Sequence, residues 1–390
     1  MNLVDLVLLV VVALAAVQGL RLGAVRQVLT YGGFWIGLYV GALLASVTVG
    51  WAHSSTARTV VAMATMVSVA VLFGVTGRLV GGVVNRRLHR GRLGPFDSGL
   101  GVAVAVAASL LTMWLIASTL VNSPSEALNS SIASSRIIRS LDTVLPAPPS
   151  VFSQMQNFLS SEGFPPVFAQ LAPLSAGPVT AASDAQVTAA VATDGRSTVR
   201  IVGVGCGGIQ EGSGFVVAPG LVVTNAHVVA GIAHPTVQDA AGSHQTQVLA
   251  FDPTYDLAVM RVPGLTDPPL ALDPTDVGRG TSATVLGYPG GGPFTAVAAG
   301  VMAEFSARGK DIYGQRLTVR DVYEVQAVVR PGNSGGPLVE SNGTVIGVVF
   351  SRSTSNGDIG YALTSPGVLS RAGAASHRTR VVATGACIGD

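Results

Sequence analysis

The first third of the chain is dominated by four long apolar stretches. They run approximately over residues 3–20, 28–51, 60–80 and 100–121. Each is close to the roughly 20 residues that a helix needs to cross a hydrocarbon core about 30 Å thick. The first stretch lacks the basic start of a signal peptide and is followed at once by three more, so we expect it to be retained. The pattern predicts a bundle of four transmembrane helices.

The second half of the chain changes to short runs of Val, Ile and Thr separated by Gly, Pro, Asn and Asp. Short strands at a spacing of roughly 8–12 residues, without helical periodicity between them, are typical of an all-β barrel or sandwich. The expected strands cover residues 199–204, 214–217, 221–224, 245–251, 258–262, 282–286, 297–305, 324–328, 337–340 and 345–350.

A segment rich in Ser, Ala and Pro separates these two parts. Proline clusters at 146–149 and 165–166 favour extended, semi-rigid chain. Loosely helical spacing over 125–141 and 151–159 predicts short helices, with Ser150 as an N-cap. We therefore predict a transmembrane domain over 1–121, a linker over 122–195 and a β domain over 196–390.

Composition and charge support a membrane protein. Only 11% of the 390 residues are charged, against about a quarter in soluble domains, and a 48% apolar content excludes disorder for most of the chain. The short loops after the first and third stretches hold six of the eight arginines of residues 1–122, and such loops are enriched in Lys and Arg on the cytoplasmic side. We therefore expect a four-span protein of the inner (plasma) membrane whose N-terminus and whole region after residue 121 are extracytoplasmic (periplasmic).

Two charged residues, Asp5 and Arg78, fall within the apolar stretches, where charge is costly. Either both side chains reach the membrane interface by snorkelling, or they pair with each other inside the bundle. The many glycines of the stretches favour close helix packing. No motif there predicts transport, although a channel or transporter stays an alternative function.

Three short segments of the β-rich half carry chemistry. An apolar strand leads to Asn-Ala-His227, Asp256 opens the apolar run Leu-Ala-Val-Met, and Ser334 stands in Pro-Gly-Asn-Ser-Gly-Gly-Pro. A serine hydroxyl that attacks a peptide carbonyl must give its proton to a base such as histidine. A buried carboxylate must hold that imidazole in the correct tautomer. We therefore predict His227, Asp256 and Ser334 as the catalytic residues.

Other acids compete with Asp256 for the third role, namely Asp239, Asp252 and Asp267. Asp256 is preferred because it directly opens an apolar strand, whereas Asp252 precedes a proline and is predicted as a turn residue.

The glycines around Ser334 are expected for a separate reason, the formation of an oxyanion hole. Converging backbone N–H groups stabilise the oxyanion of the tetrahedral intermediate, and losing one such donor costs about 3 kcal/mol. Such convergence uses backbone conformations that side chains obstruct. We predict the N–H groups of Gly332 and Ser334 as the oxyanion-hole donors.

These motifs, in the order His, Asp, Ser, resemble the chymotrypsin-fold serine proteases and particularly their bacterial HtrA-like branch. The runs Gly-Ser-Gly-Phe215 and Ile359-Gly-Tyr-Ala-Leu363 fit that branch too. The resemblance covers about residues 196–375 and implies two six-stranded β-barrels with the active site between them. The expected fold class is therefore multidomain, an all-α four-helix transmembrane bundle followed by an all-β chymotrypsin-like double β-barrel.

The N-terminal part resembles the colicin V production protein family of small four-span inner-membrane proteins. The similarity rests on Asp5, on the run Gly19-Leu-Arg-Leu-Gly-Ala-Val-Arg26 and on the Gly-rich second stretch. The two parts in this order resemble the MarP-type membrane-anchored periplasmic proteases of mycobacteria and related actinobacteria. That likeness implies a serine endopeptidase with a role in resisting acid or oxidative stress.

Substrate preference follows from the resemblance. In chymotrypsin-like proteases the residue six before the nucleophile often lies at the base of the specificity pocket, and here it is Val328. We therefore expect a medium apolar P1 side chain rather than Lys or Arg. The edge of the strand near 348–352 is expected to pair with extended substrate. The expected substrate-binding residues are Val328, Val349, Phe350, Ser351 and Arg352.

The chain has two cysteines, Cys206 and Cys387, and both fall in the part expected outside the cytoplasm. Oxidising compartments favour disulfides, so we predict a bond between them, with two unpaired thiols as the alternative.

The histidines show no metal-ligand spacing, so neither a metal nor a cofactor is expected. The expected partners are protein or peptide substrates and the lipid bilayer, and not nucleic acid; the oligomeric state stays open. A catalytically weak peptide-binding stress sensor or scaffold with a protease fold is the alternative function.

Overall fold

The computed structural model describes residues 2–48, 55–88, 94–121, 125–146, 167–169, 171–173 and 175–388. They belong to two compact units, and each is described by itself. The first consists of Met1–Ser118 and Ser134–Pro146, and the second of Thr119–Ala133 and Ala147–Asp390. The helix expected over 151–159 and its N-cap Ser150 lie outside the described residues.

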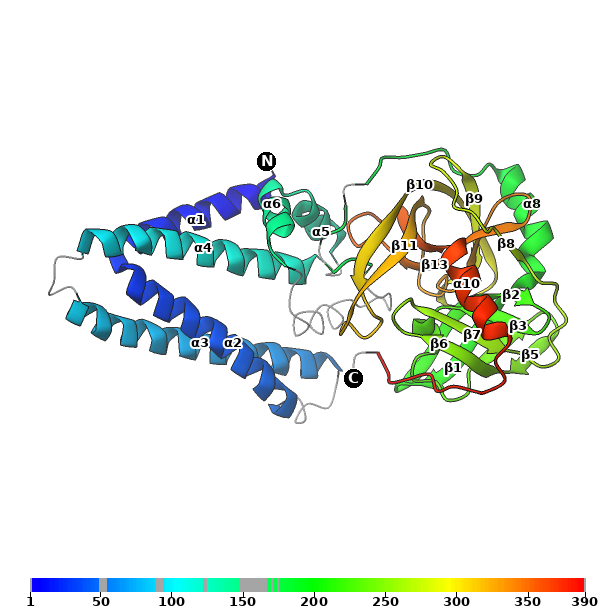
Figure 1. The fold of residues 1–390 in the computed structure, drawn as a ribbon, viewed down its shortest axis with the longest axis horizontal. Helices are drawn as coiled ribbons and strands as arrows, with labels where there is room; N and C mark the ends of the chain where they lie inside the picture. Colours follow the sequence, from blue (N-terminus) through cyan, green and yellow to red (C-terminus); the bar gives the residue numbers. More distant parts are fainter. Residues whose placement is uncertain are drawn as a thin grey trace. The chain divides into compact units, whose positions relative to one another are not determined.

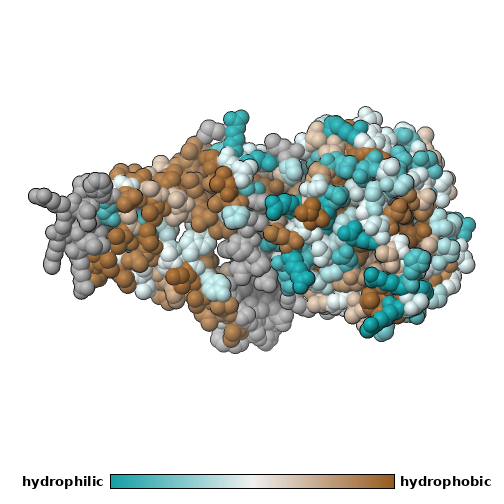
Figure 2. All heavy atoms as spheres, viewed as in Figure 1, coloured by the Kyte–Doolittle hydropathy of each residue, from teal (hydrophilic) through white to brown (hydrophobic). Residues whose placement is uncertain are grey.

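Four long helices of the first unit correspond to the four apolar stretches, as predicted (Figure 1). They are α1 (Leu3–Leu22), α2 (Ala24–Thr48), α3 (Ser55–Leu88) and α4 (Gly94–Leu120). All four contain segments long and apolar enough to cross a membrane. Figure 2 shows apolar residues over most of the visible surface of these helices, as a lipid-facing surface requires.

Helices α2 and α3 pack through glycines of α2. A Cβ atom added to Gly33 would lie 2.5 Å from the carbonyl oxygen of Phe73, and one added to Gly41 would lie 2.8 Å from Cα of Met66. Any side chain at these positions would push the two backbones apart. Small residues therefore set the distance between these helices, as expected where lipid supplies no hydrophobic drive for association.

Asp5 in α1 has a role that neither sequence interpretation anticipated. Its side chain is fully buried and accepts hydrogen bonds from the Ser135 hydroxyl at 2.6 Å and from the backbone N–H of Ile137 at 3.2 Å. It thereby binds the N-terminus of α6 (Arg136–Val144), whose N-cap is Ser135. The pairing of Asp5 with Arg78 is therefore wrong, and Arg78 is exposed on α3.

Replacing Asp5 with alanine should loosen α6. Loss of a capping acceptor costs about 1 kcal/mol, and the buried Ser135 hydroxyl would also lose its partner. Hydrogen exchange of residues 136–144 in the full-length protein in detergent should therefore be faster, by roughly 5-fold for that free energy. Exchange in the β-strands of the second unit serves as the internal control. Unchanged protection of α6 would contradict the assigned role.

Within its described residues, the second unit contains fourteen strands in two sheets. Figure 1 shows their arrangement. The first sheet holds β1 (Thr198–Gly205), β2 (Gly208–Ala218), β3 (Leu221–Thr224), β4 (Thr236–Asp239), β5 (Gly242–Gln245), β6 (Gln247–Asp252) and β7 (Leu257–Arg261). The second holds β8 (Ala271–Leu272), β9 (Ser282–Gly287), β10 (Thr295–Lys310), β11 (Leu317–Gln326), β12 (Pro337–Val339), β13 (Thr344–Arg352) and β14 (Ile359–Thr364). Short helices flank them, namely α5 (Glu126–Ala133), α8 (Asp184–Asp194), η2 (Gly195–Ser197), α9 (Ala226–Val229), η3 (Pro289–Gly291) and α10 (Ser365–Ser376).

The sheets curl as the predicted double-barrel fold requires. The first has the order β5-β4-β1-β2-β3-β7-β6 and is antiparallel throughout. In the second, β12 pairs with both β9 and β13, which closes a ring of strands β9-β10-β11-β14-β13-β12 with β8 added outside on β13. Each sheet has its own apolar cluster, and a third cluster contains Phe215 and Val259 of the first sheet with Phe350 and Leu363 of the second.

The strand prediction differs from the structure in informative places. The strand expected over 245–251 is interrupted at Thr246, whose hydroxyl bonds to the Pro235 carbonyl, so β5 and β6 are separate. The strands β4, β8 and β14 were not predicted. Part of the segment expected as linker packs on the second sheet, since the N–H of Ala182 donates to the carbonyl of Ala299 in β10. Its helices α5 and α6 also belong to different units.

A disulfide joins Cys206, in the turn between β1 and β2, to Cys387. The C-terminal segment reaches it along the first sheet, where the N–H of Val382 donates to the carbonyl of Val248 and the Thr384 hydroxyl donates to that of Ile232. The bond thus closes a loop with a sequence separation of 181, which contains the second sheet and all strands of the first sheet except β1.

Breaking this disulfide should destabilise the second unit. Loop-entropy arguments give about 5 kcal/mol for a loop of this length, and measured losses are typically about 2–4 kcal/mol. Cys387→Ser in the full-length protein should therefore unfold at lower denaturant concentration, and Cys206→Ser/Cys387→Ser should match it. Identical unfolding midpoints for wild type and both variants would contradict this prediction.

Candidate active site

His227 lies where β3 gives way to the short helix α9. The strand is buried at all four positions, which fixes its direction, and the next residues turn into the helix. The His227 side chain is buried, and its Nδ1 atom lies 2.8 Å from Oδ2 of Asp256. A carboxylate only accepts hydrogen bonds, so Nδ1 carries the proton and Nε2 is left as the acceptor. This is the tautomer that a general base needs.

Asp256 is fully buried at the turn before β7, as its place at the mouth of an apolar strand predicts. Its second carboxylate oxygen accepts the backbone N–H of His227 at 2.9 Å, and its own carbonyl accepts the amide of Asn225 at 2.9 Å. The backbone of Asp256 has φ +66°, a left-handed conformation that Asp and Asn tolerate better than most residues. The carboxylate is thus held on the imidazole from several directions.

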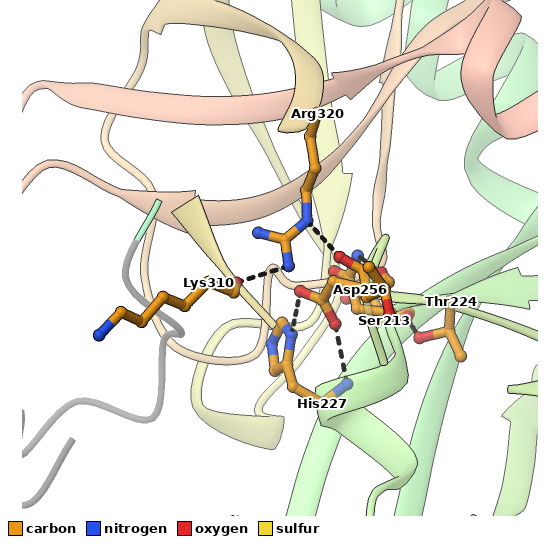
Figure 3. A network of polar contacts seen from close by, with 8 residues as sticks. Ser213, Thr224, His227, Asp256, Lys310 and Arg320 are labelled. Carbon is orange, nitrogen blue, oxygen red and sulfur yellow. Dashed lines mark hydrogen bonds and ion pairs between the residues drawn. The ribbon is translucent and has the colours of Figure 1, made fainter. Parts of the chain in front are cut away.

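A buried arginine that no sequence motif indicates supports this site. Arg320 of β11 donates from Nε to the carbonyl of Thr254 at 2.9 Å and from Nη2 to that of Lys310 at 2.8 Å (Figure 3). Burial lowers the pKa of the Arg320 guanidinium, and the charge of Asp256 opposes that shift. Arg320 therefore braces the turn that carries Asp256 and places a positive charge near its carboxylate.

Ser334 stands in the loop before β12 and is buried with the neighbouring glycines. The N–H of Gly335 donates to the carbonyl of Val349, and the N–H of Val349 donates to that of Gly336. Gly335 has φ +83°, and a Cβ there would collide with the carbonyl oxygen of Ser213. Within the described residues, the Ser334 hydroxyl makes no hydrogen bond to His227. Such contacts are often long without substrate and tighten in the reacting complex.

The predicted oxyanion-hole donors lie in a loop that leaves no room for a side chain at Gly332. Gly332 has φ +92°, and a Cβ atom there would lie 2.7 Å from the backbone nitrogen of Gly290. Among the residues that the structure describes, neither the N–H of Gly332 nor that of Ser334 has a protein acceptor. Both are therefore available to an oxyanion.

The expected substrate-binding residues fall in different settings. Val328 is 42% exposed, as a residue at a binding surface can be. Val349 and Phe350 are fully buried. Both backbone groups of Val349 form hydrogen bonds to the loop of residues 330–336 that carries Ser334, called the nucleophile loop below. A register shift between Val349 and Ser351 leaves Phe350 out of the β13–β14 ladder. Ser351 and Arg352 pair with Tyr361 and Gly360 of β14.

The competing acids lie elsewhere. Asp252 accepts the N–H groups of Thr254 and Tyr255, both at 3.0 Å, as a turn residue does. Asp239 lies 3.0 Å from His244, and although burial acts to raise its pKa, hydrogen bonds from His244 and two backbone N–H groups lower it. Burial and the neighbouring Asp239 raise the pKa of Asp267. Within the described residues, none of these three acids forms a hydrogen bond or an ion pair with His227.

Comparison with known families matches both halves of the chain. Residues 4–146 match the family described as colicin V production protein. Residues 212–348 match the family described as trypsin-like peptidase domain. The second match contains all three predicted catalytic residues.

Individual relatives are proteases. Serine protease Rv3671c of Mycobacterium tuberculosis (strain ATCC 25618 / H37Rv) is 34% identical over 393 residues, which is 98% of either chain. The solved structure of the Rv3671c protease in its active form is 39% identical with a TM-score of 0.53, and covers 56% of this chain and 96% of its own. The mitochondrial serine protease HTRA2 of Bos taurus is 37% identical over 163 residues, 40% of this chain and 34% of that protein.

Asp256→Asn should preserve the fold and remove most of the activity. Asparagine tolerates the left-handed backbone, but it cannot stabilise the imidazolium or enforce the same tautomer, and the equivalent loss in a Ser-His-Asp triad is about 10⁴-fold in kcat. Steady-state hydrolysis of a fluorogenic peptide measures the effect. The matched control is Asp252→Asn, which should change kcat less than about 3-fold, or about 0.6 kcal/mol. Equal losses in both variants would remove Asp256 from its role.

Proposed function

The chain belongs to the family of serine proteases that join a colicin V production protein domain to a trypsin-like peptidase domain, and from this membership we propose that it cleaves extracytoplasmic proteins through His227, Asp256 and Ser334. One observation carries the residue assignment. The buried carboxylate of Asp256 holds the His227 ring through Nδ1. Ser334 lies in a glycine-rich loop, and within the described residues the N–H groups of Gly332 and Ser334 donate to no protein acceptor.

In the first half of the proposed reaction, the Ser334 hydroxyl oxygen attacks the scissile carbonyl carbon. His227 takes the hydroxyl proton on Nε2, and the carboxylate of Asp256 stabilises the imidazolium that forms. The carbonyl π electrons move onto its oxygen, which the N–H groups of Gly332 and Ser334 receive. When this intermediate collapses, the C–N bond breaks and the leaving amine takes the proton from His227. An acyl group is then esterified to Ser334.

In the second half a water molecule replaces the amine. His227 accepts one proton from the water as its oxygen attacks the acyl carbon, and returns it to the Ser334 oxygen as the ester bond breaks. The products are a free carboxylic acid and the original enzyme. Because the two halves use the same groups, no metal or cofactor is needed to balance the reaction.

Substrate binding is proposed at the irregular end of β13. There the register shift leaves Phe350 out of the ladder with β14, and an extended substrate is proposed to add as a strand beside this residue. The exposed Val328 supports an apolar P1 preference.

The proposed location is the extracytoplasmic side of the inner membrane. It is supported by the arginine-rich loops after the first and third stretches, by the four apolar helices and by the disulfide, which oxidising compartments favour. A role in resisting acid or oxidative stress is proposed from the resemblance to MarP-type proteases.

Labelling with a fluorophosphonate tests the assignment of the nucleophile. The full-length protein in detergent should be labelled at Ser334 and lose its activity, because only an activated serine reacts readily with this reagent. Ser334→Ala should abolish both labelling and hydrolysis, whereas Ser353→Ala, a buried serine of the neighbouring strand region, should retain both. A wild-type protein that binds peptide but resists labelling would instead support a peptide-binding sensor or scaffold.

A further inference from the structure

Ser213 of β2 lies fully buried against the nucleophile loop, although the proposed reaction gives it no role. Its N–H donates to the carbonyl of Ser334 at 2.8 Å. Its hydroxyl donates to the carbonyl of Gly332 at 2.6 Å and accepts the N–H of Tyr288 at 2.9 Å. Its own carbonyl accepts the Thr224 hydroxyl at 2.7 Å, and Figure 3 shows this bond in the polar network of the His227–Asp256 pair.

These contacts complete a series of three fixed peptide carbonyls. The carbonyl of Pro331 accepts the N–H of Gly290 at 2.6 Å, and that of Asn333 accepts the N–H of Gly336 at 2.9 Å. Between them, the carbonyl of Gly332 is held by the Ser213 hydroxyl. In a trans peptide the C=O and N–H groups point in opposite directions. The outer two carbonyls therefore orient the N–H groups of Gly332 and Ser334, and the middle one fixes the rotation of the backbone between them.

Only the middle carbonyl is held by a side chain, so only this contact can be removed without changing the backbone. The site also leaves little room for another residue. A Cβ atom on Gly287 would lie 2.7 Å from the Ser213 hydroxyl oxygen, and one on Gly335 would collide with the Ser213 carbonyl. A hydroxyl is the smallest group that can accept from Tyr288 and donate to Gly332 at the same time.

We infer that Ser213 is a positioning residue for the oxyanion hole, whose hydroxyl ties the Gly332–Asn333 peptide to both sheets so that the N–H groups of Gly332 and Ser334 converge on one point. It does not touch the substrate. The inference rests on the proposed function, because it takes those two N–H groups as the oxyanion donors.

Ser213→Ala in the full-length protein in detergent tests this role. We expect kcat for a fluorogenic peptide to fall about 10- to 100-fold with KM changed less than about 2-fold, since the oxyanion forms only after substrate binds and the donors are displaced rather than removed. A trifluoromethyl ketone of the same peptide forms a tetrahedral oxyanion adduct. Its Ki should rise by the same factor as kcat/KM falls, which a purely structural role would not produce.

Two further variants make the result decisive. Thr224→Val removes another hydroxyl from the same buried region but keeps both bonds of the Ser213 hydroxyl, and it should alter kcat less than about 3-fold, or about 0.6 kcal/mol. Ser213→Cys keeps the side-chain size with a much weaker donor, and replaces the alanine variant if that does not fold. It should also lose kcat and inhibitor affinity together.

The outcomes separate the inference from the proposed function. Wild-type kcat and Ki in the folded Ser213 variants, or equal losses in Thr224→Val, would overturn the positioning role. Hydrolysis that persists in Ser334→Ala would instead overturn the proposed nucleophile. Loss of activity in Ser334→Ala, together with parallel losses of kcat/KM and inhibitor affinity in the Ser213 variants, would support both.

Discussion

The carboxylate of Asp256 places a charge where the protein leaves it no contact with water. A buried charge is costly unless it is hydrogen-bonded and paired. Here both oxygens are occupied by His227, one by its ring and one by its backbone, and the positive charge of Arg320 lies nearby. The same requirement that makes the carboxylate tolerable in the core therefore fixes the imidazole, so the stability and the chemistry of this site share their contacts.

The nucleophile loop meets a comparable constraint at the boundary of the two sheets. Three of its carbonyl groups each accept a hydrogen bond from a different place: the turn at Gly290, the strand β2 at Ser213, and the loop itself at Gly336. Because β2 belongs to the first sheet and the turn follows β9 of the second, neither sheet alone can hold the loop. Packing the sheets against each other is thus what gives the loop one conformation.

Local patterns in the sequence predicted the parts of this arrangement that are local. Alternating and continuous apolar runs located most strands, β3 with the observed bounds. The three motifs predicted His227, Asp256 and Ser334, and the first two form a hydrogen bond. Ser213 and Gly332 are 119 residues apart, and Asp5 and Ile137 are 132 apart, so no periodicity relates them. The composition also did not predict that residues near Ala182 pack on β10. A segment rich in Ser, Ala and Pro is typical of linkers, but it can equally form an extended segment that is hydrogen-bonded to a sheet.

A chain with so few charged residues uses several of its carboxylates in one way. Asp97 accepts the N–H groups of Ala24 and Val25 at the start of α2, and Asp5 accepts that of Ile137 at the start of α6. Asp256 accepts that of His227 in the first turn of α9. The first N–H groups of a helix lack acceptors within the helix and carry a partial positive charge. A carboxylate supplies both the acceptor and the opposite charge. In the apolar unit this contact joins one helix to the start of another, and in the β unit it holds the backbone of His227 on the carboxylate that also binds its ring.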